Sequence, residues 1–382
     1  MDLKEYTLDE LLPYEQPTKY IVESTKYDDS YKTPVLTAGK SFILGYTNET
    51  EGIFEKDRLP VIIFDDFTTA SQYVNFPFKV KSSAMKILNV NTDLVLPKYI
   101  YYLMQTIQIE HDTHKRYWIQ HFSKIKVTIP SLEIQEKIVE RLDEMNSQID
   151  EGITTLKKTD SLLNVYRDAV LDDAFKGDYK KVPLAEISEA ISGYAFKSSN
   201  YTDSGKYVVI KIGNVKEQFF DFGRDLTRTN EVDEKILAKY LLQEGDCVIT
   251  LTGSRGKRDY GFVSMVTNQD NYLLNQRVAA LRFERTKAIP KFYQYYLMSN
   301  EYRNAFFSYE TGNVGQGNVG IKALSEPLVV LPTIEEQEKI VALIESKLSV
   351  CKSIEQTIKN TLVEAEALRQ SALKKAFEGG LA

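Results

Sequence analysis

The chain has little cysteine and no long apolar run, and each shortage narrows what it can be. Cys247 and Cys351 are its only cysteines, which are too few for a framework of disulfides or a cysteine-based zinc site. No uninterrupted apolar segment approaches the roughly 20 residues that a membrane span needs. The start, MDLKEYTLDE, lacks the basic region and apolar core of a signal peptide. This pattern predicts a cytoplasmic protein.

An overall excess of positive charge is missing as well. The net charge is −6, which at first argues against a nucleic-acid binder. The average hides a pattern, because residues 67–128 carry eight Lys and Arg against three Asp and Glu, and residues 247–330 carry ten against six. Local fields rather than net charge steer a polyanion, so two basic faces on an acidic frame are compatible with DNA binding.

The chain contains one motif that occurs twice. IPSLEIQEKIV at 129–139 returns 202 residues later as LPTIEEQEKIV at 331–341, with seven of eleven positions identical. Two copies at that distance predict two large units of one design. Each copy has a proline followed by acidic residues, which is typical of a helix start because carboxylates suit the positive N-terminal dipole.

A long helix is predicted after each copy, over 133–176 and over 335–378. Each has about 44 residues, which correspond to roughly 65 Å at 1.5 Å per residue. Apolar residues recur every seven positions, the pattern of a helix packed along another helix. We therefore expect the two helices to pack as an antiparallel coiled coil. The predicted interface is Leu142, Ile149, Leu156, Leu163, Val170, Ile344, Cys351, Ile358 and Leu362, with Tyr166 in the same frame.

Short strand-like runs separated by turns fill the two remaining segments. PKYIYYLM at 97–104 returns as PKFYQYYLM at 290–298, and the spacing of its apolar residues predicts a helix in each segment. The predicted strands are 32–36, 59–64, 84–90 and 125–129 in the first segment, and 206–212, 246–251 and 278–283 in the second.

The predicted fold class is α+β, with two similar globular α/β domains separated by the two long helices and a pseudo-twofold internal repeat. An antiparallel helix pair would put one globular domain at each end. The predicted segments are a first globular domain at 1–128, a central long helix at 129–177, a second globular domain at 178–330 and a C-terminal long helix at 331–382.

The order of domain, helix, domain and helix, with both helices beginning P-x-[LI]-E-x-Q-E-K-I-V, resembles the specificity subunit of type I restriction–modification systems. The resemblance covers essentially the whole chain. It departs from the family's usual double proline at Ser131 and Thr333, where a small hydroxyl residue also suits a helix start. The residues that carry it are Pro130, Glu133, Gln135, Ile138 and Val139, and again Pro332, Glu335, Gln337, Ile340 and Val341.

This resemblance implies a non-catalytic DNA-recognition chain. The segments 1–128 and 178–330 would be target recognition domains, each reading one half of a bipartite double-stranded DNA target. The helices would set the spacer and dock two modification subunits, which a restriction subunit can join. S-adenosylmethionine, ATP and Mg would belong to those partners, and no cofactor to this chain. The alternative is a two-headed coiled-coil adaptor that binds proteins and no DNA, and salt-dependent DNA binding would separate the two.

The sequence contains no recognisable catalytic motif. It has no G-x-x-x-x-G-K-[ST] phosphate loop and no Asn-Pro-Pro-Tyr or Asp-Pro-Pro-Tyr string, which an adenine methyltransferase would need. GSRGKRDYG at 253–261 resembles a phosphate cradle but lacks the strand–loop–helix spacing of a nucleotide site. We interpret it as a DNA-backbone contact or a plain hairpin turn.

Metal chemistry has two weak candidates. His111, His114 and His121 are the only histidines, but their spacing fits no common metal motif, so we predict surface or DNA-facing side chains and no metal. Asp65 and Asp66 follow a predicted strand and could suggest a metal-dependent nuclease. We prefer a turn with strand-end aspartates, or one that reads cytosine amino groups.

The loops before each motif copy are the best candidates for DNA contacts. TGNVGQGN at 311–318 corresponds by the offset to IEHDTHKR at 109–116. Glycine lets a backbone approach phosphate, and Gln or Asn pairs with adenine in the major groove; the alternative is a solvent loop. The predicted DNA-binding residues are Lys79, Lys81, Lys115, Arg116 and Tyr117 in the first domain, and Arg255, Lys257, Arg258, Arg277 and Gln316 in the second.

Overall fold

The computed structural model of the chain describes residues 3–39, 41–107, 117–223, 226–230, 232–268, 271–313 and 315–378. Its contacts divide the chain into unit 1, Met1–Lys157 with Lys359–Ala382, and unit 2, Lys158–Ile358. The division cuts both long helices, α4 (Leu132–Ala174) and α8 (Ile334–Phe377). Each unit therefore joins one globular part to a portion of both helices, whereas the four consecutive segments predicted from the sequence stay a prediction.

A four-stranded sheet forms the centre of unit 1. Its order is β2 (Tyr14–Glu15), β8 (Met85–Asn89), β5 (Val61–Asp65) and β6 (Ser71–Val74). Strand β5 has apolar residues on both faces, because successive side chains of a strand point to opposite sides. Ile62 and Phe64 pack into one core, and Val61 and Ile63 pack into another. The sheet is therefore covered on both faces.

A helical layer covers one face of that sheet in unit 1. Helix α2 (Pro97–Thr106) contributes Tyr99 and Ile100 to the core that contains Ile62 and Phe64. Helix α3 (Tyr117–Gln120) adds Trp118, which lies edge-on to Phe64 with the ring centroids 5.2 Å apart. The other face meets the small sheet of β4 (Ile43–Thr47), β3 (Thr33–Leu36) and β7 (Lys79–Val80), in which β3 and β7 are parallel.

Unit 2 repeats this topology. Its central sheet has the order β11 (Ser188–Ser192), β19 (Val278–Phe283), β15 (Cys247–Thr250) and β17 (Val263–Met265). In both sheets the first strand in the chain pairs with the fourth, which pairs with the second, which pairs with the third. The second sheet of unit 2 again contains a parallel pair, β13 (Tyr207–Ile210) with β18 (Tyr272–Leu274). The duplication predicted from the motif is confirmed in the fold.

The remaining elements are short. They are α1 (Leu8–Leu11), α5 (Glu234–Tyr240), α6 (Pro290–Met298), α7 (Asn300–Ser308), β1 (Lys4–Thr7), β9 (Lys126–Ile129), β10 (Lys181–Pro183), β12 (Tyr201–Thr202), β14 (Arg228–Thr229), β16 (Thr252–Gly253), β20 (Glu310–Thr311), β21 (Gly317–Val319) and β22 (Leu328–Val330). The strands predicted from the sequence are confirmed as β3, β5, β8, β9, β13, β15 and β19. The repeated PK motif forms α2 and α6, and the two long helices begin and end within two residues of their predicted bounds.

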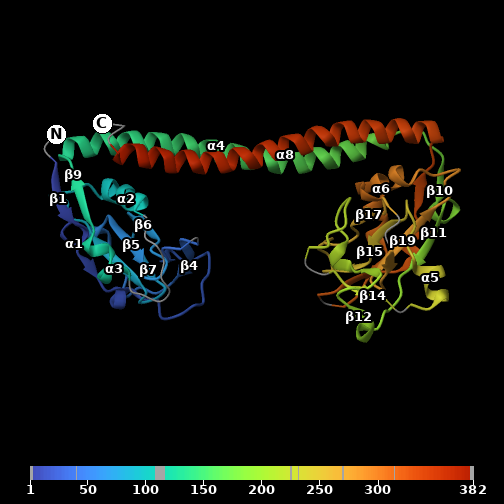
Figure 1. The fold of residues 1–382 in the computed structure, drawn as a ribbon, viewed down its shortest axis with the longest axis horizontal. Helices are drawn as coiled ribbons and strands as arrows, with labels where there is room; N and C mark the ends of the chain where they lie inside the picture. Colours follow the sequence, from blue (N-terminus) through green and yellow to red (C-terminus); the bar gives the residue numbers. More distant parts are fainter. Residues whose placement is uncertain are drawn as a thin grey trace. The chain divides into compact units, whose positions relative to one another are not determined.

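The two long helices lie side by side and antiparallel within each unit (Figure 1). In unit 1, Leu142 packs with Leu373, and Arg369 Nη1 donates to Asn146 Oδ1 at 3.1 Å. In unit 2, Leu171 packs with Ile344, and Arg167 Nη2 lies 2.6 Å from Glu355 Oε1. Of the predicted interface residues, Leu142, Leu163, Val170, Ile344, Cys351 and Ile358 are buried, and Ile149, Leu156 and Leu362 are half-buried.

One residue of the predicted helix interface was assigned wrongly. Tyr166 keeps 47% of its surface exposed, and the neighbouring Val165 keeps 64%. The seven-residue line itself stays buried, so the error lies in adding Tyr166 as a second position beside it. Leu163 and Val170, which flank it in the same count, are buried.

The motif that occurs twice forms the joint between each globular part and its helix. Gln135, at the start of α4, is fully buried, and its Oε1 accepts the backbone N–H of Leu96 at 2.8 Å. Its Nε2 donates to the carbonyls of Leu94 and Pro130 at 3.2 and 2.9 Å. Because a side-chain amide has both donors and an acceptor, one residue satisfies three backbone groups there. The start of α4 is thereby tied to the start of α2.

Candidate nucleic-acid interface

Two loops predicted to contact DNA lie together in unit 2. The turn that follows β16 and the hairpin of β20 and β21 join in one small sheet, in which Thr252 pairs with Asn318 and Gly253 with Gly317. The segments are about 60 residues apart in the chain, so neither the turn nor the hairpin alone reveals the neighbourhood. Lys257 and Gln316 are exposed on these two segments.

Each arginine of the turn contacts another segment of unit 2, Arg255 the hairpin and Arg258 helix α7. Arg255 Nη1 donates to the carbonyl of Gly312 across the small sheet at 2.6 Å. Arg258 Nη1 donates to Asn304 Oδ1 of α7 at 2.8 Å, and its guanidinium lies 5.2 Å from the ring centroid of Phe307. Both side chains are exposed, so their charge still contributes to the local field. Their hydrogen-bonding groups are partly occupied within the chain.

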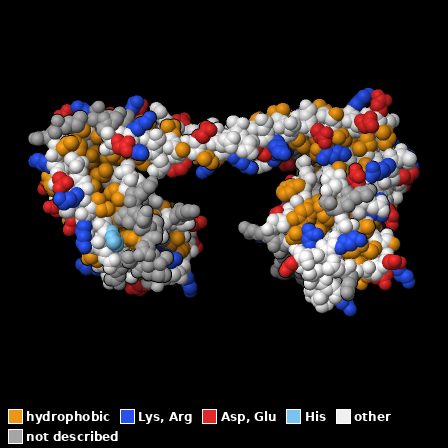
Figure 2. All heavy atoms as spheres, viewed as in Figure 1, with side chains coloured by type: hydrophobic (Ala, Val, Ile, Leu, Met, Phe, Trp, Pro, Cys, Tyr) orange, Lys and Arg blue, Asp and Glu red, His pale blue; other side chains and the backbone are white. Residues whose placement is uncertain are grey.

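Arg277 lies beside the same loops. It is exposed in the turn between β18 and β19. Its carbonyl accepts the backbone N–H of Leu251 at 3.1 Å, directly before β16. The five residues predicted for the second domain therefore come from neighbouring loops of unit 2. Figure 2 shows basic and apolar side chains next to one another on the visible face of its globular part.

A hydrogen bond between a tyrosine and a glutamate also links the same two loops. Tyr260, which is 1% exposed, donates its hydroxyl to Glu310 Oε1 at 2.7 Å. Burial, together with this hydrogen bond to a carboxylate, raises the pKa of Tyr260 well above its usual range. The tyrosine therefore stays a neutral donor at every physiological pH. Sequence reasoning missed both residues, because an acidic residue next to a candidate DNA contact carries no signal of its own.

The residues predicted for the first domain are less exposed. Lys79 is 3% exposed, and its Nζ lies 2.7 Å from Glu49 Oε2 and donates to the Glu51 carbonyl at 2.7 Å. Tyr117 is buried in the core beside Trp118. These two side chains are part of the packing of unit 1, so we withdraw them as base contacts. Lys81 is exposed, and Lys115 and Arg116 lie outside the described residues.

Asp65 and Asp66 have structural roles at the end of β5. Asp65 Oδ1 accepts the backbone N–H groups of Phe67 and Thr68 at 2.8 and 3.0 Å, which stabilises the turn. Asp66 is 2% exposed; its Oδ1 accepts the N–H of Trp118 at 2.8 Å, and its Oδ2 lies 3.3 Å from Lys86 Nζ. This geometry supports the turn interpretation over a nuclease site.

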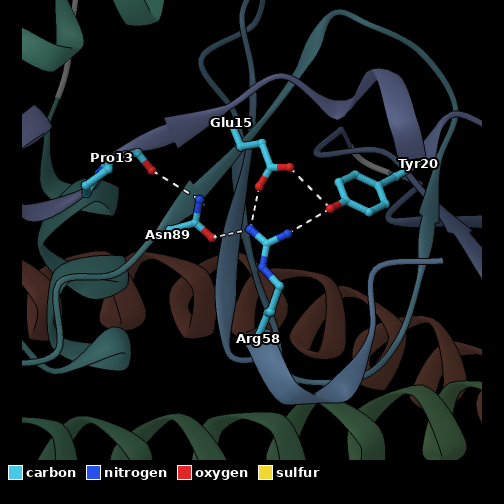
Figure 3. A network of polar contacts seen from close by, with 5 residues as sticks. All are labelled: Pro13, Glu15, Tyr20, Arg58 and Asn89. Carbon is cyan, nitrogen blue, oxygen red and sulfur yellow. Dashed lines mark hydrogen bonds and ion pairs between the residues drawn. The ribbon is translucent and has the colours of Figure 1, made fainter. Parts of the chain in front are cut away.

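Arg58 is an exposed cation of unit 1 that is ion-paired and hydrogen-bonded within the chain. Figure 3 shows its guanidinium between Glu15, Tyr20 and Asn89, with which it forms hydrogen bonds. It also lies over the ring of Phe54, 4.6 Å from the centroid. The hydrogen bond with Arg58 lowers the pKa of Glu15, and the same contact raises the pKa of the guanidinium. The positive charge of Arg58 is therefore paired with the carboxylate of Glu15 at the surface.

A pocket of about 400 Å³ in unit 2 combines cations with aromatic rings. It is lined by Lys206 and Arg228 beside Phe222 and Tyr272. Cations and stacked rings are also what a nucleic-acid strand contacts. These residues lie on strands and turns of the second sheet, and no local motif marked them in the sequence.

The described residues contain neither a metal-ligand cluster nor a helix that could span a membrane. No cluster of three or more His, Cys, Asp or Glu side chains with metal-binding geometry occurs among them. His111 and His114 lie outside these residues, and His121 is exposed. None of the described helices combines the length and the apolarity that a membrane span requires.

The helix pair has an apolar surface of its own. In unit 1 a groove between α4 and α8 is lined by Met145, Ile149, Leu156 and Leu368, among others. In unit 2 exposed apolar side chains follow the helices, and Figure 2 shows such side chains at the surface along α8. Those with about half or more of their surface exposed include Leu162, Val165, Leu343 and Val350.

Comparison with known proteins places this architecture in a family. The sequence model of the family described as "Type I restriction modification DNA specificity domain" matches residues 1–159 and 176–364. The specificity subunit of the type I restriction enzyme EcoR124I/EcoR124II from Escherichia coli is 46% identical over 197 residues, covering 49% of this chain and 48% of that protein. The EcoKI specificity subunit from Escherichia coli K12 is 26% identical over 278 residues, covering 68% and 58%. The chain thus spans about half the length of the curated relatives that it matches.

Solved structures agree in fold. A chain from a structure of the type I R-M system, described for complex assembly and conformational transition, aligns with a TM-score of 0.70 at 15% identity, covering 99% of this chain and 98% of its own. The HsdS subunit from Thermoanaerobacter tengcongensis aligns with a TM-score of 0.56 at 16% identity, covering 99% and 97%. The family match takes in most of the sequence and both copies of the repeated fold. The chain belongs to the type I restriction modification DNA specificity domain family.

Proposed function

We propose that this chain is the DNA sequence-specificity subunit of a type I restriction–modification complex. Each globular part reads one half of a bipartite target in double-stranded DNA. The observation that carries the proposal is the family match over 1–159 and 176–364, which coincides with two central sheets of identical strand order. A protein that reads two half-sites needs two such modules on one chain.

Basic loops support the DNA contact. Lys257, Arg277 and Gln316 are exposed on neighbouring loops of unit 2, where cations bind phosphates and an amide can pair with adenine. Lys81 supplies an exposed cation in unit 1. We also propose Arg255 and Arg258 as backbone contacts, since both guanidinium groups remain at the surface, and we keep Lys115 and Arg116 as proposed contacts in the first domain.

The helices are proposed to dock modification subunits and to set the spacer between the half-sites. The apolar groove of unit 1 and the exposed apolar side chains of α4 and α8 in unit 2 support docking, because surfaces of this kind mark protein interfaces. Each long helix has residues in both units. The number of residues in each helix is set by the sequence, so the helix length is the same in every molecule. Two modification subunits, one for each copy of the motif, match the duplication.

Chemistry is proposed to lie with the partners. S-adenosylmethionine would bind the modification subunits, and ATP with Mg would bind a restriction subunit where one joins the complex. The chain itself would be non-catalytic and would act in the cytoplasm, where DNA is accessible.

Mapping of methylated adenines tests this proposal. The genome of a host that expresses the modification subunit is mapped with and without this chain. We expect methylation at one bipartite sequence only when the chain is present, and exchange of residues 178–330 for those of a relative should change one half of that sequence. An identical map in all cases would favour the protein adaptor. Salt-dependent DNA binding by the assembled complex provides the second readout.

A further inference from the structure

Glu310 ties together the two exposed loops of unit 2. It is half-buried at the start of β20. Its Oε1 accepts the Tyr260 hydroxyl at 2.7 Å, and both of its carboxylate oxygens lie 3.3–3.4 Å from the backbone N of Gly256. Gly256 and Tyr260 bracket the turn that carries Lys257 and Arg258. One carboxylate thus holds both ends of the basic turn against the hairpin.

Glycine leaves room for this contact. A Cβ on Gly317 would lie 2.5 Å from Glu310 Oε1, 3.0 Å from the Tyr260 hydroxyl and 3.1 Å from the Cα of Arg255. Any larger residue would have to displace the carboxylate or the turn. The close approach of β21 to the turn therefore depends on a residue without a side chain, and Gln316 is the adjacent position. The backbone next to Gln316 is therefore held close to the basic turn.

Unit 1 has a corresponding contact, but there the carboxylate lies on the other of the two segments that meet. By strand order, the loop between β5 and β6 corresponds to the loop between β15 and β17. Both loops contain a non-glycine residue with positive φ, Thr69 at 59° and Arg258 at 54°. In unit 1 the carboxylate is on this loop, since Asp66 accepts the N–H of Trp118 from the segment after α2. In unit 2 the carboxylate belongs to Glu310, which lies on the hairpin of β20 and β21 and not on the loop between β15 and β17.

We propose that Glu310 is a positioning residue for sequence recognition by the second domain. It makes the basic turn and the Gln316 hairpin one rigid surface, so that phosphate contacts and the amide meet the DNA in a constant register. The inference rests on the proposed function, because a positioning role requires that the domain reads DNA. Glu310 itself touches no base, because its oxygens face Tyr260 and Gly256.

The register argument follows from the geometry. Phosphate contacts fix the position of a protein on the duplex, while base contacts carry sequence information. When both kinds of contact sit on loops that move independently, the amide can slide relative to the phosphates. A bond between the loops removes that freedom, so its loss should weaken discrimination between bases more than it weakens binding itself.

The test compares three variants of the full chain assembled with its modification subunits. Glu310→Ala removes the contact, Tyr260→Phe removes only one hydroxyl, and Glu310→Gln keeps an oxygen acceptor for Tyr260. The readout is methylation of a DNA library randomised at one half-site at a time. The half-site of the second domain is assigned beforehand by exchange of residues 178–330.

We expect Glu310→Ala and Tyr260→Phe to lower the preference for the correct base at the second half-site by about tenfold, as expected for a lost hydrogen bond to a charged group. The first half-site should keep its preference, and Glu310→Gln should restore most of the second. Unchanged preferences at both half-sites in Glu310→Ala and Tyr260→Phe would overturn the inference, as would equal losses at both. A wild-type complex that methylates no bipartite sequence would instead overturn the proposed function.

Discussion

The side chain of Gln337 accepts a hydrogen bond from the backbone N–H of Ile289, with Oε1 2.8 Å from the nitrogen. Its Nε2 donates to the carbonyls of Lys287 and Pro332, both at 2.9 Å. Gln135 makes the same three contacts in unit 1. In each unit, a buried amide therefore connects the first turn of a long helix to the segment that begins α2 or α6. This joint is the structural role of the repeated motif.

Replacement of Gln337 by Ala should destabilise unit 2. The N–H of Ile289 and two carbonyls would lose a buried partner, and an unsatisfied buried group costs about 1–3 kcal/mol. Denaturant unfolding measures this change. The matched variant Gln135→Ala should destabilise unit 1 by a similar amount. Glu136→Ala, at an exposed position of the same motif, serves as the control and should stay within about 0.5 kcal/mol. Equal stability of the glutamine variants and this control would contradict the joint.

The two helix starts should respond differently to acid. Glu336 Oε2 accepts the backbone N–H and the hydroxyl of Thr333, both at 2.8 Å. These hydrogen bonds lower the pKa of Glu336 below its usual 4.5. A carboxyl with a lowered pKa contributes stability above its usual pKa and loses it as the pH falls through the folded value. The contribution is therefore complete near neutral pH and is lost below about pH 4.5.

Glu336→Gln should remove this pH dependence. The amide cannot titrate but keeps an oxygen that can accept from Thr333, so unfolding measured from pH 6 to pH 2 should show a shallower decline than the parent chain. Glu338→Gln, at an exposed position in the same helix, is the comparison. In the first copy of the motif Ile134 stands at the position of Glu336, so of the two long helices only α8 can form this capping box. A parallel decline in the parent chain and in Glu336→Gln would refute the assignment.

Helix length should determine the spacer of the DNA target. Insertion of four residues into α4 near Lys157, matched by four in α8 near Lys359, keeps the helices paired where the two units meet in sequence. One added turn contributes about 6 Å, or roughly two base pairs. We expect the unread spacer to lengthen by that amount with both half-sites unchanged. Mapping of methylated adenines measures this. An active complex with the original spacer would show that the helices do not set it.

Lys257 should contribute to DNA affinity without contributing to base preference. It is exposed in the basic turn, where a lysine acts as a phosphate contact. Lys257→Ala should weaken binding of the complex similarly on all sequences and reduce the slope of log K against log salt by about one. Lys339→Ala, on α8 beside Glu335, is the control and should leave the slope unchanged. A sequence-dependent loss in Lys257→Ala would instead make this lysine a base contact.

Much of the fold could be predicted because its signals are local. The repeated motif marks both helix starts, and the alternating or continuous apolar runs mark β5 and β15. The role of Gln135 could not be predicted, since its partner Leu96 lies 39 residues away in the chain. The pattern showed that the glutamine recurs and left open which backbone groups it satisfies. Tyr166 was placed wrongly for a related reason, because apolar spacing does not show which neighbours of the buried line face the partner helix, and Tyr166 is 47% exposed.

The predicted DNA-binding lysines differ in their exposure, and the sequence could not show this for a different reason. Lys79 and Lys257 are alike in sequence, each a lysine in a basic segment. Lys79 is buried with Glu49 as its partner, whereas Lys257 is exposed. A charged side chain enters the interior only with a partner, and the chain brings Glu49 to Lys79 through the pairing of β3 with β4 and β7. No local rule distinguishes the two lysines.

The duplication, the two long helices and the family resemblance can be recognised from the amino-acid sequence alone, because repetition and apolar periodicity are properties of the chain order. Which cations are exposed and which are buried with a partner depends on the three-dimensional fold. The fold also brings together Glu310 and Tyr260, which are 50 residues apart in the chain and form a hydrogen bond between two loops. Hydrogen bonds and burial between distant segments depend on how the strands pair. The chemistry at the surface therefore follows from the sheet order, which a linear pattern does not contain.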